Sequence, residues 1–89
     1  MTFEVRVPPT AARQLTDRLP HAAAAACVEF IFGPLAERPR MVGAPLRAPF
    51  EGQWRARRGE YRVRYETDDS KGIVTVLDAD HRRGIYRQP

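Results

Sequence analysis

The chain has 89 residues, of which 43% are hydrophobic and 29% are charged. This length gives one domain with one core, residues 1–89, and the composition excludes a disordered or fibrous protein. The formal charge is +4, and 14 of the 15 cationic residues are arginine. The position of this charge says more than its total, because a basic domain with arginine clustered on one surface is typical of a nucleic-acid binder.

The N-terminal segment predicts a strand followed by a helix. Residues 2–7 alternate apolar and polar side chains, as one half-buried strand does, and Pro8 and Pro9 end it. Pro9 or Thr10 can start a helix. Its apolar stripe consists of Ala12, Leu15 and Leu19.

A second helix is predicted over residues 21–32, after Pro20, because an alanine run has high helix propensity. Gly33 and Pro34 break or kink it, and a last turn reaches Glu37. With the first helix it forms an antiparallel hairpin. The face that we expect to be buried follows the helical period and consists of Val28, Ile31, Phe32 and Leu35. Cys27, the only cysteine, reads as a buried structural thiol and favours a reducing compartment.

Three strands complete the chain after a proline-rich connecting loop over residues 38–50. Two of them meet at Gly59, and residues 67–72 form a polar turn to the third. The third, residues 73–77, is an apolar run that reads as a strand buried on both faces. The predicted fold is α+β: an N-terminal strand, a helical hairpin, and a three-stranded antiparallel meander that completes a twisted sheet.

Residues 54–65, WRARRGEYRVRY, are the most informative stretch. Strand residues alternate between faces, so Trp54, Tyr61 and Tyr65 are expected in the core. The opposite face then gathers guanidinium groups that suit phosphate, from Arg55, Arg57, Arg62 and Arg64. A solvated face is the plain alternative, but such a face usually mixes charges, and only Glu60 offsets the arginines within this stretch.

The sequence resembles the RelE/ParE superfamily of bacterial toxins from type II toxin–antitoxin pairs. The residues that carry the resemblance are Leu46, GQWRARRGEYRVRY at 52–65, the aliphatic strand IVTVL, and DHRRGIYR at 80–87. The resemblance implies a RelE-like fold and, for the RelE branch, an mRNA endonuclease that acts in the ribosomal A site and inhibits translation and growth. It also implies a cognate antitoxin in a complex that is oligomeric.

The resemblance further implies roles for particular residues. Arg62 and Arg82 match the two arginines that hold the scissile phosphate, and Tyr86 matches the aromatic residue near the C-terminus. RNA-binding positions are matched by Arg55 and Arg57, and Arg64 lies on the same strand face. No metal or other cofactor is implied, because the ribose 2′-OH itself attacks the adjacent phosphate.

The proton-transfer group is less clear from the sequence. Arginine stays protonated and is a poor general base. Some relatives place a glutamate where this chain has Pro49. His81 is then the titratable candidate for general acid or base, and its alternative is a structural histidine at a strand end.

Two other functions stay open. A ParE-like toxin would inhibit DNA gyrase without a ribonuclease site, and a basic nucleic-acid-binding module would have no catalytic activity. The longest apolar stretch, residues 22–28, is too short to span a membrane, so we expect a cytoplasmic protein without membrane association.

Overall fold

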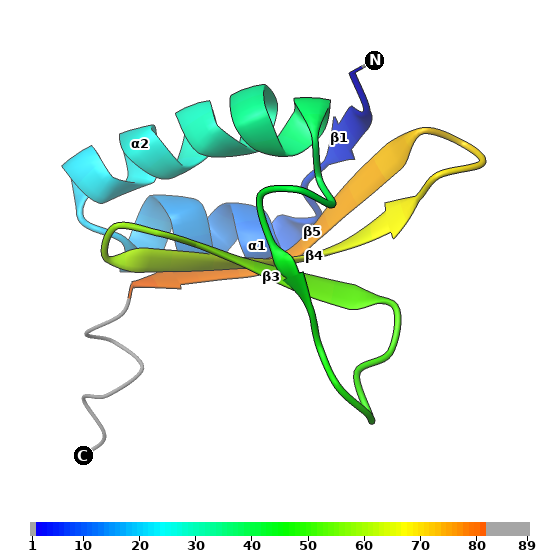
Figure 1. The fold of residues 1–89 in the computed structure, drawn as a ribbon. Coiled ribbons are helices and arrows are strands. Elements are labelled where there is room, and N and C mark those ends of the chain that lie inside the picture. Colours follow the sequence, from blue (N-terminus) through cyan, green and yellow to red (C-terminus); the bar gives the residue numbers. More distant parts are fainter. Residues whose placement is uncertain (1, 82–89) are drawn as a thin grey trace.

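A mixed five-stranded sheet carries both helices on one face (Figure 1). The computed structural model describes residues 2–81. In chain order the elements are β1 (Glu4–Arg6), α1 (Pro9–Arg13) with η1 (Gln14–Arg18), α2 (His21–Phe30) with η2 (Ile31–Leu35), β2 (Ala44–Pro45), β3 (Gln53–Arg58), β4 (Tyr61–Asp68) and β5 (Ile73–His81).

The strand order is β1-β5-β4-β3-β2, with β1 parallel to β5 and all other neighbours antiparallel. The predicted α+β class and the β3–β4–β5 meander are confirmed. The connecting loop is only partly a loop, because Ala44 and Pro45 pair with β3 as an edge strand. Proline fits there, since an edge strand does not need every N–H group for the ladder. Gly59 turns β3 into β4 with a φ of 60°, in the left-handed region that glycine adopts without strain.

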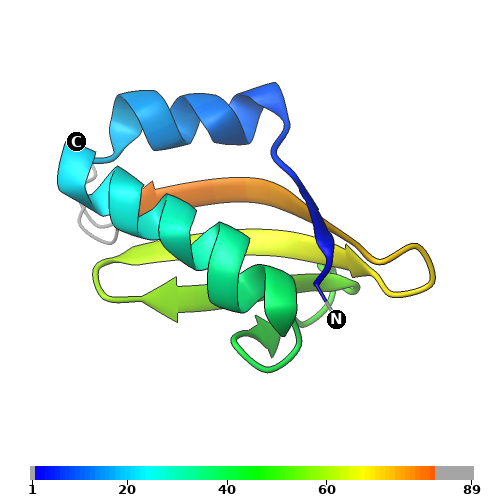
Figure 2. The ribbon, with the colours of Figure 1, turned by 90° about the horizontal axis from the view of Figure 1, so that it is seen from above.

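Each helix ends in a π-helical turn rather than a plain α-helical one. η1 continues α1 from Gln14 to Arg18, and η2 continues α2 through Pro34, which the wider turn accommodates. The predicted kink near Gly33 and Pro34 is therefore a change of helical pitch and not a break. Seen from above, α2 crosses over the sheet while α1 lies along the β5 side (Figure 2).

The buried face of α2 differs from the prediction. Ile31 and Leu35 are fully buried as expected, but Val28 is 40% exposed and Phe32 56% exposed. Cys27 and Phe30 are buried in their place. The alanine run gives no amphipathic contrast, so packing against the sheet, and not the helical period alone, fixes which face turns inward.

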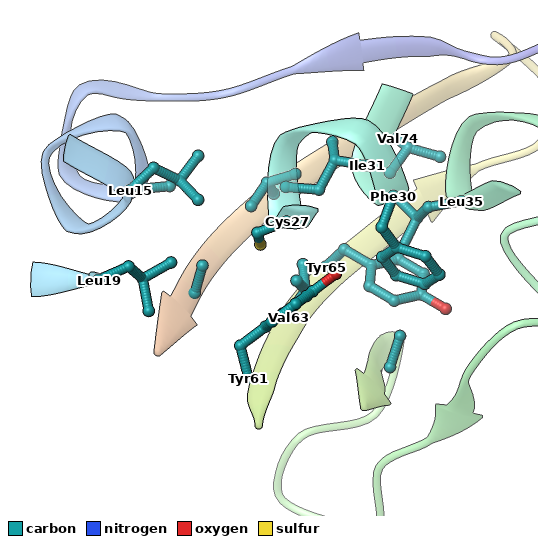
Figure 3. Packing of buried hydrophobic residues seen from close by; sticks show 14 residues of the cluster. Leu15, Leu19, Cys27, Phe30, Ile31, Leu35, Tyr61, Val63, Tyr65 and Val74 are labelled. Atoms are coloured by element: carbon teal, nitrogen blue, oxygen red, sulfur yellow. The ribbon is translucent and has the colours of Figure 1, made fainter. Parts of the chain in front are cut away.

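The core fills the space between the helices and the inner face of the sheet (Figure 3). The sheet contributes mainly Tyr61, Val63 and Tyr65, as the alternation predicts, and Trp54 packs at its margin. Both tyrosines keep a hydrogen bond while buried: Tyr65 donates its hydroxyl to Pro39 O at 2.5 Å and Tyr61 donates to Ala26 O at 3.0 Å.

Cys27 is fully buried in this core. Burial raises the pKa of its thiol to about 12, because the apolar surroundings disfavour the thiolate. The interpretation of Cys27 as a structural thiol is confirmed, since a nucleophile needs the ionised form.

β5 is buried on one face and not on both. Val74 and Val76 are fully buried, whereas Ile73, Thr75 and Leu77 are only half-buried. The ladder with β4 also shifts: Tyr65 pairs with Val76, but Arg64 pairs with Asp78, so Leu77 forms a bulge. The bulge reverses the alternation, and Ala79 rather than Asp78 enters the core. No helix in the described part of the chain is long and apolar enough to cross a membrane.

Candidate nucleic-acid interface

The open face is the side of the sheet that the helices leave uncovered, and the arginines lie there. Strand pairing defines it, because residues that pair directly share a face. The pairs that form it are Gln53↔Glu66, Arg55↔Arg64 and Arg57↔Arg62 between β3 and β4, and Arg64↔Asp78 and Arg62↔Asp80 between β4 and β5.

Two arginine pairs face each other directly across β3 and β4, which places like charges at the closest cross-strand spacing. Such pairs destabilise a sheet. Part of the repulsion is offset from β5, where Asp78 and Asp80 lie beside Arg64 and Arg62. The sequence alternation did not predict these two carboxylates on the open face, because only the bulge at Leu77 turns them there.

Arg64 is held by internal contacts. Its Nε and Nη2 donate to Asp78 Oδ2 at 2.9 and 2.5 Å, and its Nη1 donates to Gln53 Oε1 at 2.8 Å. The Gln53–Arg64–Asp78 tie therefore spans three neighbouring strands. Both charged side chains are about one-third exposed, so the tie lies at the surface of the sheet and not within the core.

Arg55 and Arg57 differ from Arg64 in their exposure and in their contacts. They are exposed, and they make no hydrogen bond or ion pair with other residues in the described range 2–81. The fifth arginine of the stretch, Arg58, lies on the other side and stacks over the Phe30 ring at 5.3 Å from its centre. The cations available to a ligand are thus concentrated on the open face of β3.

Two hollows adjoin on the open face, and both are lined by Arg55 and Arg62. One, of about 310 Å³, is bounded by the β2 edge and contains arginine as its only charged residue type; its other lining residues are Arg57, Val42, Gly43 and Ala44. The other, of about 360 Å³, lies toward the first helix and mixes charges; it adds Gln14, Arg64, Asp78 and Asp80.

Gln14 is a further residue of the site that the sequence did not indicate. It starts the π-helical turn η1, and its Oε1 accepts a hydrogen bond from the backbone N–H of Ala79 at 2.8 Å. β1 pairs only with residues 73–75 of β5, so Gln14 satisfies an edge N–H of β5 that lies beyond the end of that ladder.

The predicted catalytic residues are only partly described. Arg62 is half-buried on the open face and lines both hollows. His81 is the last residue of β5 and pairs with Tyr61, so its register position lies on the helix side of the sheet and not on the open face with Arg62 and Asp80. Arg82 and Tyr86 lie outside the described residues. Within the described part of the chain, no three His, Cys, Asp or Glu side chains cluster in a way that could hold a metal ion.

Comparison with known proteins identifies the relatives of this chain. Residues 5–86 match the family described as the ParE toxin of the type II toxin–antitoxin system parDE. Two proteins of Mycobacterium tuberculosis are similar: "Toxin RelE" is 48% identical over 96% of this chain and 87% of its own length, and "Toxin RelG" is 47% identical over 99% and 100%. The crystal structure of the M. tuberculosis toxin–antitoxin complex RelBE2 superposes with a TM-score of 0.88 at 45% identity, over 92% of this chain and 100% of that one.

Proposed function

The chain belongs to the ParE toxin family of the RelE/ParE superfamily, as the toxin of a type II toxin–antitoxin system, and we propose that it is a ribosome-dependent mRNA endonuclease. The observation that carries this proposal is the gathering of Arg55, Arg57 and Arg62 around one hollow on the open face whose only charged lining residues are these arginines. A phosphodiester backbone is the ligand that such a hollow suits, because guanidinium groups bind phosphate oxygens through paired, charge-assisted hydrogen bonds.

The names of the relatives favour the RelE branch. Both M. tuberculosis proteins carry RelE-type names and match almost the whole length of this chain. The arginines also fit the binding of a polyanion such as RNA, since Arg55 and Arg57 are exposed without partners among residues 2–81. Cations that are held ready for a polyanion are the expected footprint of nucleic-acid binding.

The chemistry that we propose transfers a phosphoryl group within the RNA strand. The ribose 2′-oxygen forms a bond to the adjacent phosphorus, the P–O5′ bond breaks, and a 2′,3′-cyclic phosphate and a 5′-hydroxyl result. The 2′-OH gives up a proton and the leaving 5′-oxygen takes one up. Arg62, with Arg82, stabilises the charge that develops on the phosphorane oxygens, which is the largest electrostatic demand of the reaction.

Proton transfer requires a different type of residue. The arginines stay protonated and cannot act as base. We propose His81 for this role; its position opposite Tyr61 is on the helix side of the sheet, so it would act on the phosphate at Arg62 from the end of β5. We assign Tyr86 to stacking on a base or orienting the nucleophile. The ribosome would present the A-site mRNA in a geometry suited to in-line attack, so the toxin itself would not have to orient the reacting atoms alone.

The partner that controls this activity is an antitoxin, as in the RelBE2 complex of the solved relative. We propose that it covers or remodels the site when bound, in an oligomeric toxin–antitoxin complex. The other partners in the proposal are the ribosome and its A-site mRNA.

The test uses purified 70S ribosomes with an mRNA in the A site, and the full chain as wild type, Arg62→Gln and Arg38→Gln. Arg38 is an exposed arginine near the end of η2 that lines neither hollow, so its variant has the same change of charge outside the proposed site. We expect cleavage by the wild type and Arg38→Gln, and a loss of about 10²–10³-fold in rate for Arg62→Gln. Equal cleavage by all three proteins would remove Arg62 from the site.

A gyrase inhibitor is the second candidate, because the matching family carries the ParE name. A supercoiling assay with purified DNA gyrase separates the two. Inhibition of supercoiling together with intact ribosome-bound mRNA would assign the chain to the ParE branch. Neither effect, with RNA binding retained, would leave a non-catalytic nucleic-acid-binding module.

A further inference from the structure

The two hollows beside Arg55 and Arg62 are similar in size but differ in the charges that line them. The hollow near β2 has three arginines and no acidic residue. The hollow near the first helix has three arginines, but Asp78 and Asp80 line it as well. A phosphate group that entered the second hollow would approach two carboxylates, and its negative charge would be repelled by theirs.

Arg64 belongs only to the second hollow and is already paired there. Two of its nitrogens donate to one oxygen of Asp78, and a third donates to Gln53. A phosphate would have to displace the Asp78 carboxylate, which is an anion of similar hydrogen-bonding geometry and is fixed to the sheet. An attached carboxylate has the advantage over a free phosphate because its position costs no further loss of entropy.

The bulge in β5 creates this arrangement. Val74 and Val76 point into the core, and regular alternation would send residue 78 inward as well. The extra residue, Leu77, shifts Asp78 onto the open face directly opposite Arg64. Bulges re-aim side chains next to functional sites. Here the bulge brings Asp80 beside Arg62 and Asp78 into an ion pair with Arg64.

We propose that Asp78 is a specificity-determining residue that withholds Arg64 from RNA through the Gln53–Arg64–Asp78 tie. The RNA backbone is then confined to Arg55, Arg57 and Arg62 and runs toward the β2 edge. This inference rests on the proposed RNA-binding function, and it assigns Arg64 a role different from the RNA-binding one expected from the sequence. Its consequence is a lower affinity for RNA in general, which leaves recognition to the ribosome that presents the substrate.

The experiment measures how the affinity for a short, single-stranded, 2′-O-methylated RNA depends on salt, by fluorescence anisotropy. The methyl group blocks the attacking 2′-oxygen, so binding is measured without cleavage. The full chain is compared as wild type, Asp78→Asn, and the double variant Asp78→Asn/Arg64→Gln, which removes both members of the ion pair and keeps the net charge. Asp69→Asn is the matched control, because it releases Arg40 from an exposed ion pair of 2.6 Å.

We expect Asp78→Asn to bind more tightly and to have a salt slope steeper by about 0.7, the value for one more neutralised phosphate on a single strand. The double variant should return to the wild-type slope, and Asp69→Asn should keep it. A slope for Asp78→Asn equal to that of Asp69→Asn would overturn the inference.

The double variant tests the inference even if Asp78→Asn does not fold. Its Asn–Gln pair can keep a hydrogen bond between β4 and β5 without charge. A double-variant slope about 0.7 shallower than the wild type would mean that Arg64 already contacts phosphate, and the inference would be wrong while the proposed function stands. Absence of salt-dependent binding by every protein, the wild type included, would overturn the proposed RNA-binding function together with the inference.

Discussion

Arg57 and Arg62 are direct partners in the β3–β4 ladder, so two arginines occupy facing positions on the open face. Nothing in the folding of a sheet favours this pair, because like charges at facing positions repel. Arg57 is exposed, and both residues line the hollow near β2, where arginines are the only charged lining residues. Asp80 on β5 lies beside Arg62 and offsets part of this repulsion, and we explain the pair by a polyanionic ligand whose charge removes the rest.

Replacing Arg57 by Gln should therefore stabilise the free protein and weaken its binding to RNA. The expected gain in the free energy of unfolding is about 0.2–1 kcal/mol at low salt, and it should shrink as salt screens the repulsion. Urea unfolding at two salt concentrations measures the gain, and anisotropy measures the affinity. Arg38→Gln is the control, for which neither quantity should change by a similar amount; a less stable Arg57→Gln protein would contradict this account.

Gly43 is predicted to tolerate no side chain. A Cβ atom there would lie 2.2 Å from the Tyr65 hydroxyl oxygen and 2.9 Å from the backbone O of Arg55. Because the second contact is with backbone, the strand itself must move, and the hydrogen bond from Tyr65 to Pro39 is lost. Gly43→Ala should cost about 1–3 kcal/mol of stability in thermal or urea unfolding.

Gly33→Ala is the matched control for that substitution. A Cβ at Gly33 meets nothing within 4 Å, and the residue lies in the helical turn η2. The expected effect is smaller than about 1 kcal/mol, because the higher helix propensity of alanine is opposed by the steric pressure of the Pro34 ring on the residue before it. A similar loss of stability in both variants would mean that the contacts around Gly43 are not the cause.

Burial of Cys27 is expected to make the free energy of unfolding decrease at alkaline pH. Burial raises the pKa of its thiol from 9.0 to about 12, and burial likewise raises the pKa of Tyr65 from 10.0 to about 12. Between about pH 9 and pH 12 the unfolded chain loses these protons before the folded chain does, so the free energy of unfolding falls as pH rises. The stability from this source is fully present below about pH 9.

Urea unfolding from neutral to alkaline pH tests this in the wild type and in Cys27→Ala. The thiol accounts for a slope of up to about 1.4 kcal/mol per pH unit, and the variant should lose that part of the slope while keeping the part from Tyr65. The native thiol should also resist alkylation at neutral pH. Identical slopes for the two proteins, or rapid alkylation of the folded wild type, would contradict the burial argument.

His81 can be tested for proton transfer separately from RNA binding. His81→Gln should lower ribosome-dependent cleavage by about 10²–10⁴-fold and leave the RNA affinity unchanged. The pH dependence of the cleavage rate distinguishes this from a structural role. If His81 is the general acid or base, the variant lacks the limb of the pH–rate profile that depends on it. A slower variant with an unchanged pH profile would mean that His81 only maintains the end of β5.

Period-2 alternation was enough to predict the open face and much of the core. It placed Arg55, Arg57, Arg62 and Arg64 on one side and Tyr61 and Tyr65 on the other, and the strand pairing confirms this. Alternation works there because the residues of β3 and β4 differ sharply in polarity from one position to the next.

The features that sequence reasoning missed depend on tertiary contacts. The bulge at Leu77 reverses the alternation of β5, and no single-sequence pattern marks it, so Asp78 was not expected opposite Arg64. On α2, alanines can face either core or solvent, and the exposure of Val28 and Phe32 follows from packing alone. Gln14 joins the site only because the first helix lies along β5.

The most direct measurement is to express this chain without its antitoxin in a bacterium and to map new mRNA 5′ ends during the first minutes. Ribosome-dependent cleavage predicts new ends confined to translated reading frames and in register with codons, and their loss in Arg62→Gln. Growth arrest with intact mRNA, or cuts in untranslated RNA as frequent as those in reading frames, would contradict the account.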